Sequence, residues 1–555
     1  LLFFCSEFLE DKQMKKVFLT LCMALALFAN GANAVEKEKV ERPKLVVGIV
    51  VDQMRWDYLY RYYDMYGEGG FKRLLANGFS CENMMLDYVP TVTAIGHTCI
   101  YTGSVPSIHG IAGNDFIIER TGKKMYCTDD ATVRGVGSDN AAGKMSPRNL
   151  LVTTITDELR LATNMRSKTI GISLKDRAAI LPAGHTANAA YWFDAATGRW
   201  ISSTYYMKEL PGWVEAYNKT NPVARLLSQG WNTMYPIEQY TQSTDDDTRY
   251  EKPFVKGQAP VMPVKTAELL KTEGYGVIRN TPYGNTMTLQ MAEEALKNEK
   301  MGQGEYTDFL AVSLSSTDYI GHQFGANAVE TEDTYIRLDK DLADFFNFLD
   351  ENVGSENYTL FLTADHAAAH NVRFLADHKI GGEAWKVEAL EASLDSLVEA
   401  RFNVKDGVRA IMNYQVNQNL ESAKADYQQV KDAVIDFLKE QRGVAYVIDQ
   451  EKAAMAAVPE PIRERVINGY NRERSGAIQI VLNPGWYEGD ERGTTHGVWC
   501  PYDAHVPLIF MGWGVNRGKT FRETHLTDIS ATLAALLKIQ MPNGCIGQPI
   551  TEIIK

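Results

Sequence analysis

The chain has 555 residues, of which 45% are hydrophobic and 23% are charged, a composition typical of a globular protein with a large core. Its formal net charge is −13, which argues against a general nucleic-acid binder because such proteins usually carry a basic face. This acidic balance does not exclude anionic substrates, since a local cluster of metal ions and basic side chains can override the overall field.

The N-terminal residues are predicted to be a processing segment. Two lysines precede a mostly apolar run over 17–28, and a small-residue cleavage site ends at Ala34. This pattern over Met14–Ala34 is that of a secretory signal peptide, and residues 1–13 are set aside as upstream sequence. No later stretch reaches the ~18 uninterrupted apolar residues of a membrane span. The mature chain keeps an odd number of cysteines, so at least one thiol is expected to have no partner within the chain.

Five apolar runs are typical of buried β-strands. The run 44–52 is apolar on both faces, and similar runs lie within 167–177, 306–318, 358–366 and 505–514. The first four end in charged residues, and ligand sites in open α/β sheets gather at the carboxyl ends of the strands. Because helical stretches separate the runs, we predict a doubly wound α/β fold with a mostly parallel central sheet flanked by helices.

Two regions, 186–285 and 371–490, interrupt this alternation. They are predicted to be inserted cap segments that lie over the site, within a single catalytic domain over 35–555. The second region contains an amphipathic stretch at 423–441. Helices of the core are expected at 150–162, 286–299, 331–350 and 526–538.

Carboxylates and imidazoles gather at the predicted strand ends. The motif STDYIGH places Asp318 and His322 four residues apart, so a helical turn puts both on one face. Oxygen and nitrogen ligands without a thiolate suit Zn²⁺ in a catalytic setting. Six such ligands are enough for a metal pair that acts on a phosphoryl group. The candidate ligands are Asp52, Asp318, His322, Asp365, His366 and His496.

Each candidate ligand also has an ordinary structural interpretation. An Asp at a strand end is often a cap or a turn former, and most of the ten histidines are expected to be structural. His370 and His505 lie near proposed ligands in the sequence and are candidates for contacts that orient them. The other histidines expected to be structural are His97, His109, His185, His378 and His525.

Lys175 and Arg177 follow another predicted strand. In an extended segment, residues two apart point to the same face, so the pair can grip the non-bridging oxygens of a phosphoryl group. A solvated strand end or an ordinary surface salt bridge explains the spacing equally well.

The stretch from Thr91 to Gly110 offers several hydroxyls, of which Thr93 stands where an apolar helical stretch begins. The positive end of a helix favours an anion, and metal coordination can turn a threonine hydroxyl into a nucleophile. The alternative is that Thr93 is only a helix N-cap, a common role for threonine. Position alone does not separate these two hypotheses.

Together these motifs resemble the alkaline phosphatase superfamily, and more narrowly the phosphate-irrepressible alkaline phosphatases of Gram-negative bacteria that use a threonine nucleophile. The resemblance spans roughly residues 44 to 550 and depends on the order of the motifs. The matching segments are VVDQMRWDYL, PTVTAIGHTCIYTGSVPSIHGIAGND, SLKDRAAILPAGH, SSTDYIGH, TADH and TTHGVWCPYDAHVPLIFMGWG.

The resemblance implies a two-zinc enzyme of the periplasm. It implies that Thr93 is the nucleophile that forms a phospho-threonine intermediate, and that phosphoryl oxygens are contacted by Asn114, Lys175 and Arg177. It also implies one zinc that activates water, held by Asp318, His322 and His496. The other zinc binds the Thr93 oxygen and is held by Asp52, Asp365 and His366.

Lys175 and Arg177 favour small phosphate monoesters as substrates. Related phosphodiesterases and nucleotide pyrophosphatases share the zincs, the threonine and the asparagine but generally lack this pair. A monoester has more charge on its non-bridging oxygens than a diester, so extra cations favour its transition state.

The sulfatases of the superfamily need a C/S-x-P-x-R motif, which the sequence at Thr93 does not match. The alternatives are a phosphodiesterase of the same superfamily and a non-catalytic exported binding protein. We expect no nucleic-acid partner and a monomer.

Overall fold

The computed structural model describes residue 16 and residues 40–418 and 426–555. The compact unit discussed below spans Pro43–Lys555. The predicted signal peptide over Met14–Ala34 lies outside the described residues, apart from Lys16.

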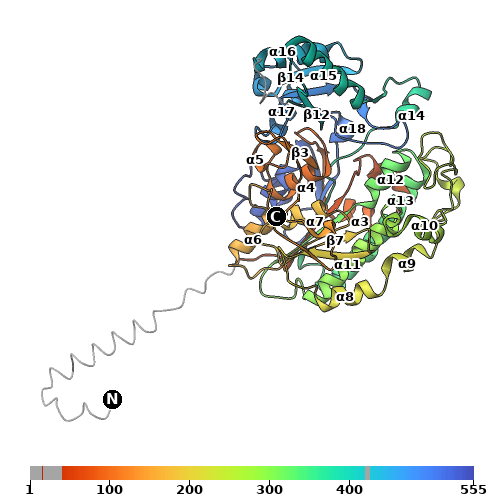
Figure 1. The fold of residues 1–555 in the computed structure, drawn as a ribbon. Coiled ribbons are helices and arrows are strands. Elements are labelled where there is room, and N and C mark those ends of the chain that lie inside the picture. The colour runs from red at the N-terminus through yellow and green to blue at the C-terminus, as the bar shows by residue number, and fades with distance from the viewer. Residues whose placement is uncertain (1–15, 17–39, 419–425) are drawn as a thin grey trace. The chain divides into compact units, whose positions relative to one another are not determined.

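A large sheet forms the centre of this unit (Figure 1). Its strands are, in spatial order, β18 (Gly518–Thr524), β2 (Phe79–Met84), β17 (Leu508–Gly512), β10 (Tyr358–Thr363), β1 (Leu45–Val51), β9 (Asp308–Leu314), β6 (Thr169–Ser173), β7 (Ala189–Asp194), β8 (Arg199–Ser203) and β5 (Gly135–Val136). The five strands from β10 to β7 are parallel to one another. This arrangement confirms the predicted α/β fold with a mostly parallel central sheet.

Antiparallel pairs adjoin the five parallel strands on both sides, while the edge strand β18 pairs parallel with β2. Strand β17, within the apolar run 505–514, pairs antiparallel with both β10 and β2. On the other side β8 pairs antiparallel with β7 and with β5. Strands β7 and β8 lie inside the region 186–285, so part of that region belongs to the central sheet.

The register of the parallel strands brings their carboxyl ends to one edge. Val50 of β1 lies opposite Ser313 of β9 and Thr363 of β10, and Ser313 also lies opposite Ser173 of β6. The residues that follow these four strands therefore meet at the same edge, where open α/β sheets bind ligands.

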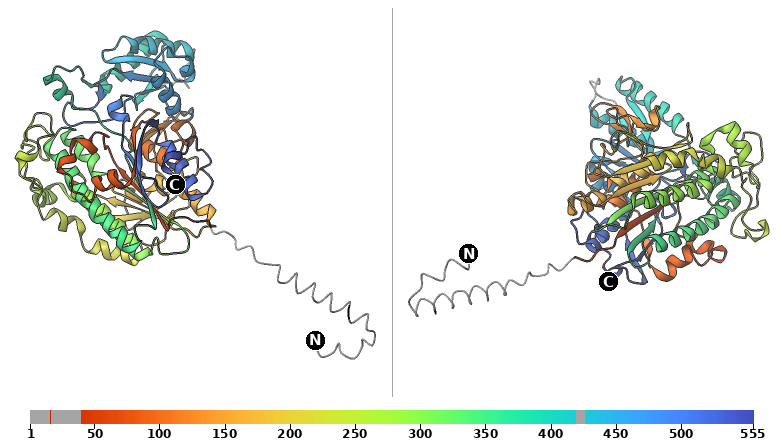
Figure 2. Two further views of the ribbon diagram at one scale, coloured as in Figure 1. Left: turned by 180° about the vertical axis from the view of Figure 1, so that it is seen from behind. Right: turned by 90° about the horizontal axis from the view of Figure 1, so that it is seen from below.

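Helices flank the sheet (Figures 1 and 2). One contacting group contains α4 (Thr93–Thr102), α7 (Asp176–Ala183) and α19 (Thr527–Leu537), and another contains α11 (Tyr283–Glu299), α12 (Ser316–Phe324) and α13 (Val329–Asn352). The helices expected at 286–299, 331–350 and 526–538 correspond to α11, α13 and α19. Helix α6 (Ile155–Ala162) begins later than expected because Thr154 and Asp157 form a reciprocal capping box at its start.

The region 371–490 builds a second, smaller sheet with its own apolar core. Its strands are β12 (Val408–Met412), β13 (Gln415–Gln418), β15 (Ile478–Leu482) and β14 (Val444–Asp449). Helices α15 (Val387–Phe402) and α16 (Tyr427–Lys439) pack against it, in cyan to blue at the top of Figure 1. Helix α16 confirms the amphipathic helix expected at 423–441, of which residues 423–425 lie outside the described part.

Two further findings concern the cysteines and the membrane. Among the described residues none of the five cysteines forms a disulfide, and Cys81, Cys99, Cys127 and Cys500 are buried. Buried thiols of this kind act as small apolar core residues. No helix in the described ranges is both long and apolar enough to cross a bilayer.

Candidate active site and metal centre

Thr93 is the first residue of α4, and Val92 is the N-cap. Val92 is extended and makes no side-chain capping bond, so the alternative that Thr93 is the N-cap is wrong. The Thr93 side chain is buried, and its Oγ1 lies 3.5 Å from His366 Nε2 and 3.4 Å from Lys175 Nζ. The hydroxyl thus stands in the first turn of a helix, where partial positive charge favours an oxyanion.

The close approach of α4 to the end of β10 requires a glycine at position 96. A Cβ atom on Gly96 would collide with the backbone and the Cβ of Asp365. Next to it, the buried His97 ring places Nδ1 2.9 Å from the Thr93 carbonyl oxygen and 3.3 Å from Asp365 Oδ2, and Nε2 2.8 Å from Ser313 Oγ. His97 was expected to be structural, and it connects helix α4 to a candidate ligand.

Asp52, Asp365 and His366 form the first candidate metal group. One ligand atom of each lies within 4.8 Å of the others, and all three side chains are fully buried. His366 Nε2 lies 3.6 Å from Asp52 Oδ1 and 3.5 Å from Asp365 Oδ2. Neither of these carboxylate oxygens accepts a hydrogen bond. Because a buried oxygen that accepts no hydrogen bond is costly, these two oxygen atoms fit a cation placed between the three residues.

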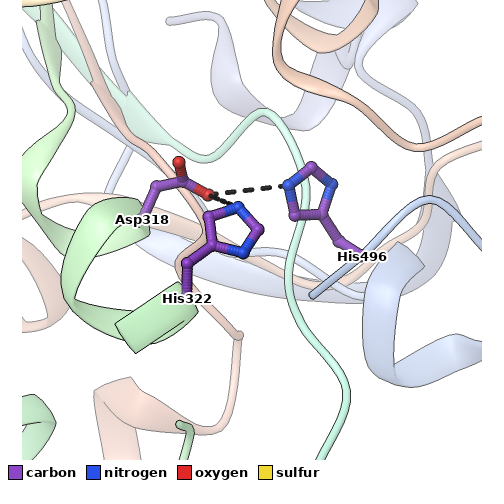
Figure 3. Close-up of side chains that lie close together, drawn as sticks. All are labelled: Asp318, His322 and His496. Atoms are coloured by element: carbon purple, nitrogen blue, oxygen red, sulfur yellow. Dashed lines mark ion pairs between the residues drawn. The ribbon is translucent and has the colours of Figure 1, made fainter. Parts of the chain in front are cut away.

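Asp318, His322 and His496 form the second group (Figure 3). As predicted, Asp318 and His322 lie one turn apart in α12, and His322 Nε2 is 3.1 Å from Asp318 Oδ1. His496 Nε2 is 3.6 Å from the same oxygen. The His496 ring stacks on the His366 ring with centroids 3.5 Å apart, so the two groups adjoin.

The three candidate histidines share one ring orientation. Each ring places Nδ1 against a backbone carbonyl oxygen, which assigns a proton to Nδ1, so that in the neutral ring the lone pair lies on Nε2. The carbonyl partners are Thr494 for His322 at 2.9 Å, Ala367 for His366 at 3.0 Å and Thr91 for His496 at 2.7 Å. Each Nε2 lone pair then faces a carboxylate oxygen, an arrangement that is repulsive unless a cation lies between them.

The charges of the two groups do not balance without cations. Three buried carboxylates share the ammonium of Lys175, whose Nζ lies 2.6 Å from both Asp52 Oδ2 and Asp318 Oδ2. Burial, together with the neighbouring Asp365 carboxylate, raises the pKa of Asp52 well above its usual value. Burial also lowers the pKa of His366 to about 3, so its ring is neutral. Carboxylates that lack positive charge and neutral imidazoles are the donors that divalent metals such as Zn²⁺ prefer, so these residues fit a pair of cations.

Lys175 reaches the site from the start of helix α7, and Arg177 lies in the first turn of the same helix. Lys175, the N-cap of α7, has an extended backbone as expected, but Arg177 lies in the first turn of the helix, so the expectation that one extended segment carries both residues is wrong. The Lys175 side chain is only 2% exposed, which contradicts the alternative of a solvated strand end. Arg177 Nη1 donates to Tyr126 Oη at 3.0 Å, and Tyr126 Oη donates to Asp176 Oδ1 at 2.5 Å. The guanidinium is therefore held in one orientation.

Asn114 contacts the start of α4. Its Oδ1 accepts a hydrogen bond from the backbone N–H of Ala94 at 2.9 Å. This contact assigns the amide orientation and leaves the NH₂ group available as a donor beside Thr93.

Other residues that support the ligands carried no signal in the sequence. Gln53 Nε2 donates to Asp318 Oδ1 at 2.7 Å, and its backbone N–H donates to Asp365 Oδ1 at 3.2 Å. The proposal that His370 and His505 orient ligands is wrong. His370 contacts the Asn327 side chain and His505 the Glu82 carbonyl oxygen.

Residues 46–503 match the family described as type I phosphodiesterase / nucleotide pyrophosphatase. Three similar proteins cover nearly the whole chain. "Calcium-transporting ATPase" of Myroides odoratus is 56% identical over 97% of this chain and 99% of its own. "Alkaline phosphatase PafA" of Elizabethkingia meningoseptica is 52% identical over 94% and 96%. "Alkaline phosphatase PhoV" of Synechococcus elongatus is 50% identical over 96% and 99%.

Solved structures of PafA have the same fold. The crystal structure of wild-type PafA superposes with a TM-score of 0.91 at 52% identity, covering 93% of this chain and 100% of that one. A PafA variant altered at one threonine, one asparagine, one lysine and one arginine gives the same TM-score at 51% identity and the same coverage. The chain therefore belongs to the type I phosphodiesterase / nucleotide pyrophosphatase family of the alkaline phosphatase superfamily. Within that family it is similar to the alkaline phosphatases PafA and PhoV.

Proposed function

We propose that this protein is an alkaline phosphatase that hydrolyses phosphate monoesters through a phospho-threonine intermediate. The observation that carries the proposal is the 3.5 Å separation of Thr93 Oγ1 and His366 Nε2, at one of two adjoining three-ligand groups. Two of the three relatives are named alkaline phosphatases, which supports the reaction class. The four residue types altered in the PafA variant are those of Thr93, Asn114, Lys175 and Arg177.

Two Zn²⁺ ions are proposed as cofactors. Asp52, Asp365 and His366 would hold one ion, and Asp318, His322 and His496 would hold the other. When bound, such a pair supplies Lewis-acid stabilisation of the attacking and leaving oxygens of a phosphoryl transfer. The orphaned carboxylate oxygens and the shared orientation of the three imidazoles support this assignment.

The chain's own groups perform a double displacement. Thr93 gives up its hydroxyl proton as Oγ1 bonds to phosphorus and the bond to the leaving-group oxygen breaks, and the departing oxygen takes up one proton, so the step releases no net proton. Asn114 and Lys175 stabilise the charge on the non-bridging oxygens. Water then cleaves the phospho-threonine bond, which releases inorganic phosphate and restores the hydroxyl. The buried surroundings of Thr93 strengthen these interactions because they exclude bulk water.

Lys175 and Arg177 favour monoesters over diesters. Lys175 Nζ lies 3.4 Å from Thr93 Oγ1, and Arg177 extends from the same helix end. The second candidate function is a nucleotide pyrophosphatase or phosphodiesterase, which the family description favours. A comparison of aryl phosphate monoesters and diesters separates the two: faster turnover of the diester would contradict the monoesterase proposal.

Replacement of the nucleophile tests the intermediate. Thr93→Ala should abolish formation of the phosphorylated protein and reduce turnover by several orders of magnitude, because the covalent route is lost. Thr102→Ala is the matched control, since Thr102 is a buried threonine of the same helix whose hydroxyl bonds only within the helix and its C-terminal turn. Unchanged turnover in Thr93→Ala would refute the assignment.

Metal analysis separates this enzyme from the third candidate, a non-catalytic exported binding protein. Two zinc ions per chain, with loss of both activity and thermal stability in chelator and recovery with Zn²⁺, are expected for the enzyme. A metal-free native protein that stays folded and inactive would support the binding protein.

We also propose a periplasmic location and a monomeric state. The predicted signal peptide, which lies outside the described residues, motivates the first. Recovery of the mature chain from the periplasm with an N-terminus after Ala34 tests the location, and its mass in solution tests the monomer. An intact N-terminus on cytoplasmic protein would contradict export.

A further inference from the structure

A polar cavity lies beside His322 at the edge of the site. Its volume is about 460 Å³, and its lining includes Lys252, Phe254, Arg279, Asn280, Tyr319 and His322. It is bounded by α12 and by the short 3₁₀ helix η4 (Tyr275–Asn280), which belongs to the region 186–285. None of the roles assigned above uses Arg279.

The cavity lies on the side from which a leaving group must depart. Thr93 stands at the group formed by Asp52, Asp365 and His366, all fully buried. In an in-line displacement the leaving oxygen departs opposite the nucleophile, toward the second metal group. Within that second group the His322 side chain is 37% exposed, against 4% for Asp318 and 7% for His496. The site therefore opens to solvent at His322.

Arg279 presents an unused guanidinium edge to this cavity. Its Nε donates to the Gly276 carbonyl oxygen at 3.2 Å, and its Cζ lies 5.1 Å from the centre of the Tyr319 ring. Within residues 40–418 and 426–555 it makes no ion pair with a carboxylate, although Glu273 also lines the cavity. The two terminal NH₂ groups remain available for a bidentate contact with an oxyanion.

Tyr319 connects this cavity to the phosphoryl site. The residue directly follows Asp318, and its ring centre lies 5.2 Å from Lys175 Nζ and 5.1 Å from Arg279 Cζ. Lys175 is the cation nearest to Thr93, while Arg279 lines the cavity. One aromatic ring thus contacts two cations. Lys175 is assigned to the phosphoryl group, and Arg279 is available to bind the leaving group of the substrate.

We propose that Arg279 is a specificity-determining residue that binds a second oxyanion on the leaving group, so that the preferred substrates are phosphate monoesters whose alcohol carries a carboxylate or another phosphate. Lys252 adds positive charge at the rim, where its Nζ pairs with Asp490 at 3.1 Å on the exposed surface. Such an exposed pair is weak and leaves Lys252 able to attract an anion. This inference rests on the proposed phosphatase function and adds the class of leaving group.

Matched pairs of esters test the proposal in the zinc-loaded full-length mature protein. The first pair is 4-carboxyphenyl phosphate and 4-carbamoylphenyl phosphate, which have similar shape but differ in charge. The second is phenyl phosphate and 4-phosphonooxyphenyl phosphate, which probes a phosphate on the leaving group. For each pair the measured quantity is a ratio of two kcat/KM values. The value for the ester whose leaving group carries the extra anion is divided by the value for the ester whose leaving group is uncharged. Comparing this ratio between variants cancels the intrinsic reactivity of the two esters.

Arg279→Ala should lower the ratio by about tenfold or more, as expected for loss of a hydrogen bond between two charged groups. Arg279→Lys should keep part of the ratio that Arg279→Ala loses. The lysine ammonium supplies the positive charge but not the two parallel N–H donors of the guanidinium. Glu273→Gln should raise the ratio, because it removes from the cavity wall a negative charge that repels the anion on the leaving group. Arg225→Ala, which removes an exposed arginine outside this cavity, should leave the ratio unchanged.

The outcomes separate this inference from the phosphatase proposal. If no ester of either pair is hydrolysed by the unaltered protein, the phosphatase function itself fails. If all are hydrolysed but Arg279→Ala lowers the charged and uncharged esters equally, or if Arg225→Ala lowers the ratio as much, the role of Arg279 is refuted. A loss in only one pair identifies whether a carboxylate or a phosphate is bound. A binding measurement with 4-hydroxybenzoate and 4-hydroxybenzamide, the products of the first pair, should show the same dependence on Arg279 without turnover.

Discussion

Replacing Lys175 with methionine tests how the site distinguishes monoesters from diesters. The unbranched methionine side chain, one atom shorter than lysine, fills most of the same space but lacks the charge that lies 3.4 Å from Thr93 Oγ1. Oxygens on a phosphorus bound to Thr93 would lie within about 4 Å of Nζ, where a unit charge contributes about 4 kcal/mol at an effective dielectric constant of about 20. Measured losses for hydrogen bonds to charged groups are smaller, about 1.5–3 kcal/mol.

From these values we expect Lys175→Met to cost about 2–3 kcal/mol of transition-state stabilisation for a monoester, or about 30- to 150-fold in kcat/KM. A diester carries less charge on its non-bridging oxygens. The transition-state stabilisation that Lys175→Met removes for a diester should therefore be about half of that removed for a monoester. The preference for the monoester should therefore fall roughly tenfold. Steady-state kinetics with 4-nitrophenyl phosphate and bis(4-nitrophenyl) phosphate measure both constants.

Two controls protect this interpretation. Lys175 Nζ also contacts Asp52 and Asp318, so the zinc content of the variant must be measured beside its activity. Lys168→Met is the matched substitution elsewhere, because Lys168 is 41% exposed and pairs with Glu299 at 3.5 Å. An equal loss for monoester and diester would show that Lys175 only organises the carboxylates, and the reasoning from phosphoryl charge would be refuted.

Two further predictions concern the architecture around the site. Gly96→Ala should lower both activity and the melting temperature, because its Cβ would collide with Asp365, whereas Gly212→Ala should be tolerated since no atom lies within 4 Å of its Cβ. Wild-type activity in Gly96→Ala would contradict the close approach. Asp157 is buried, and its five hydrogen bonds outweigh the effect of burial and lower its pKa to about 2. Because its folded pKa is depressed, its contribution of about 2 kcal/mol is present above pH ~4 and is lost as the pH falls toward 2. Asp157→Asn should therefore lower the melting temperature at pH 7, and the difference from the unaltered protein should disappear in acid. A difference that does not change with pH would contradict the assignment. Asp157 raises the pKa of the neighbouring His185 against the effect of burial, so the stability that His185 contributes is lost as the pH rises through that raised pKa.

Local sequence patterns predicted much of the fold and the metal chemistry. Runs of apolar residues identified the strands β1, β6, β9 and β10 because a strand buried on both faces has no polar alternation. The spacing of Asp318 and His322 predicted one helical face, since residues four apart are neighbours within a single turn. The strands β7 and β8 escaped detection because they lie in a region whose composition suggested an insertion.

Local patterns could not predict the contacts between distant residues. Lys175 was expected in an extended segment, but the chain turns into α7 at that residue, and the direction of its side chain follows from packing. His97 contacts Asp365 only because Gly96 lets α4 approach the end of β10. No spacing rule connects residues so far apart in the chain.

The sequence by itself determined the kinds of ligand and the hydroxyls available, because residue type fixes which atoms can bind a cation or attack phosphorus. Only the tertiary structure decided which hydroxyl lies beside the candidate metal ligands. Thr91 and Thr93 are two residues apart, yet Thr91 gives its carbonyl oxygen to His496 while Thr93 turns its hydroxyl toward His366. The physical reason is that helix α4 begins at Thr93, and the register of β1, β9 and β10 brings the candidate ligands Asp52, Asp318 and Asp365 to the same edge of the sheet.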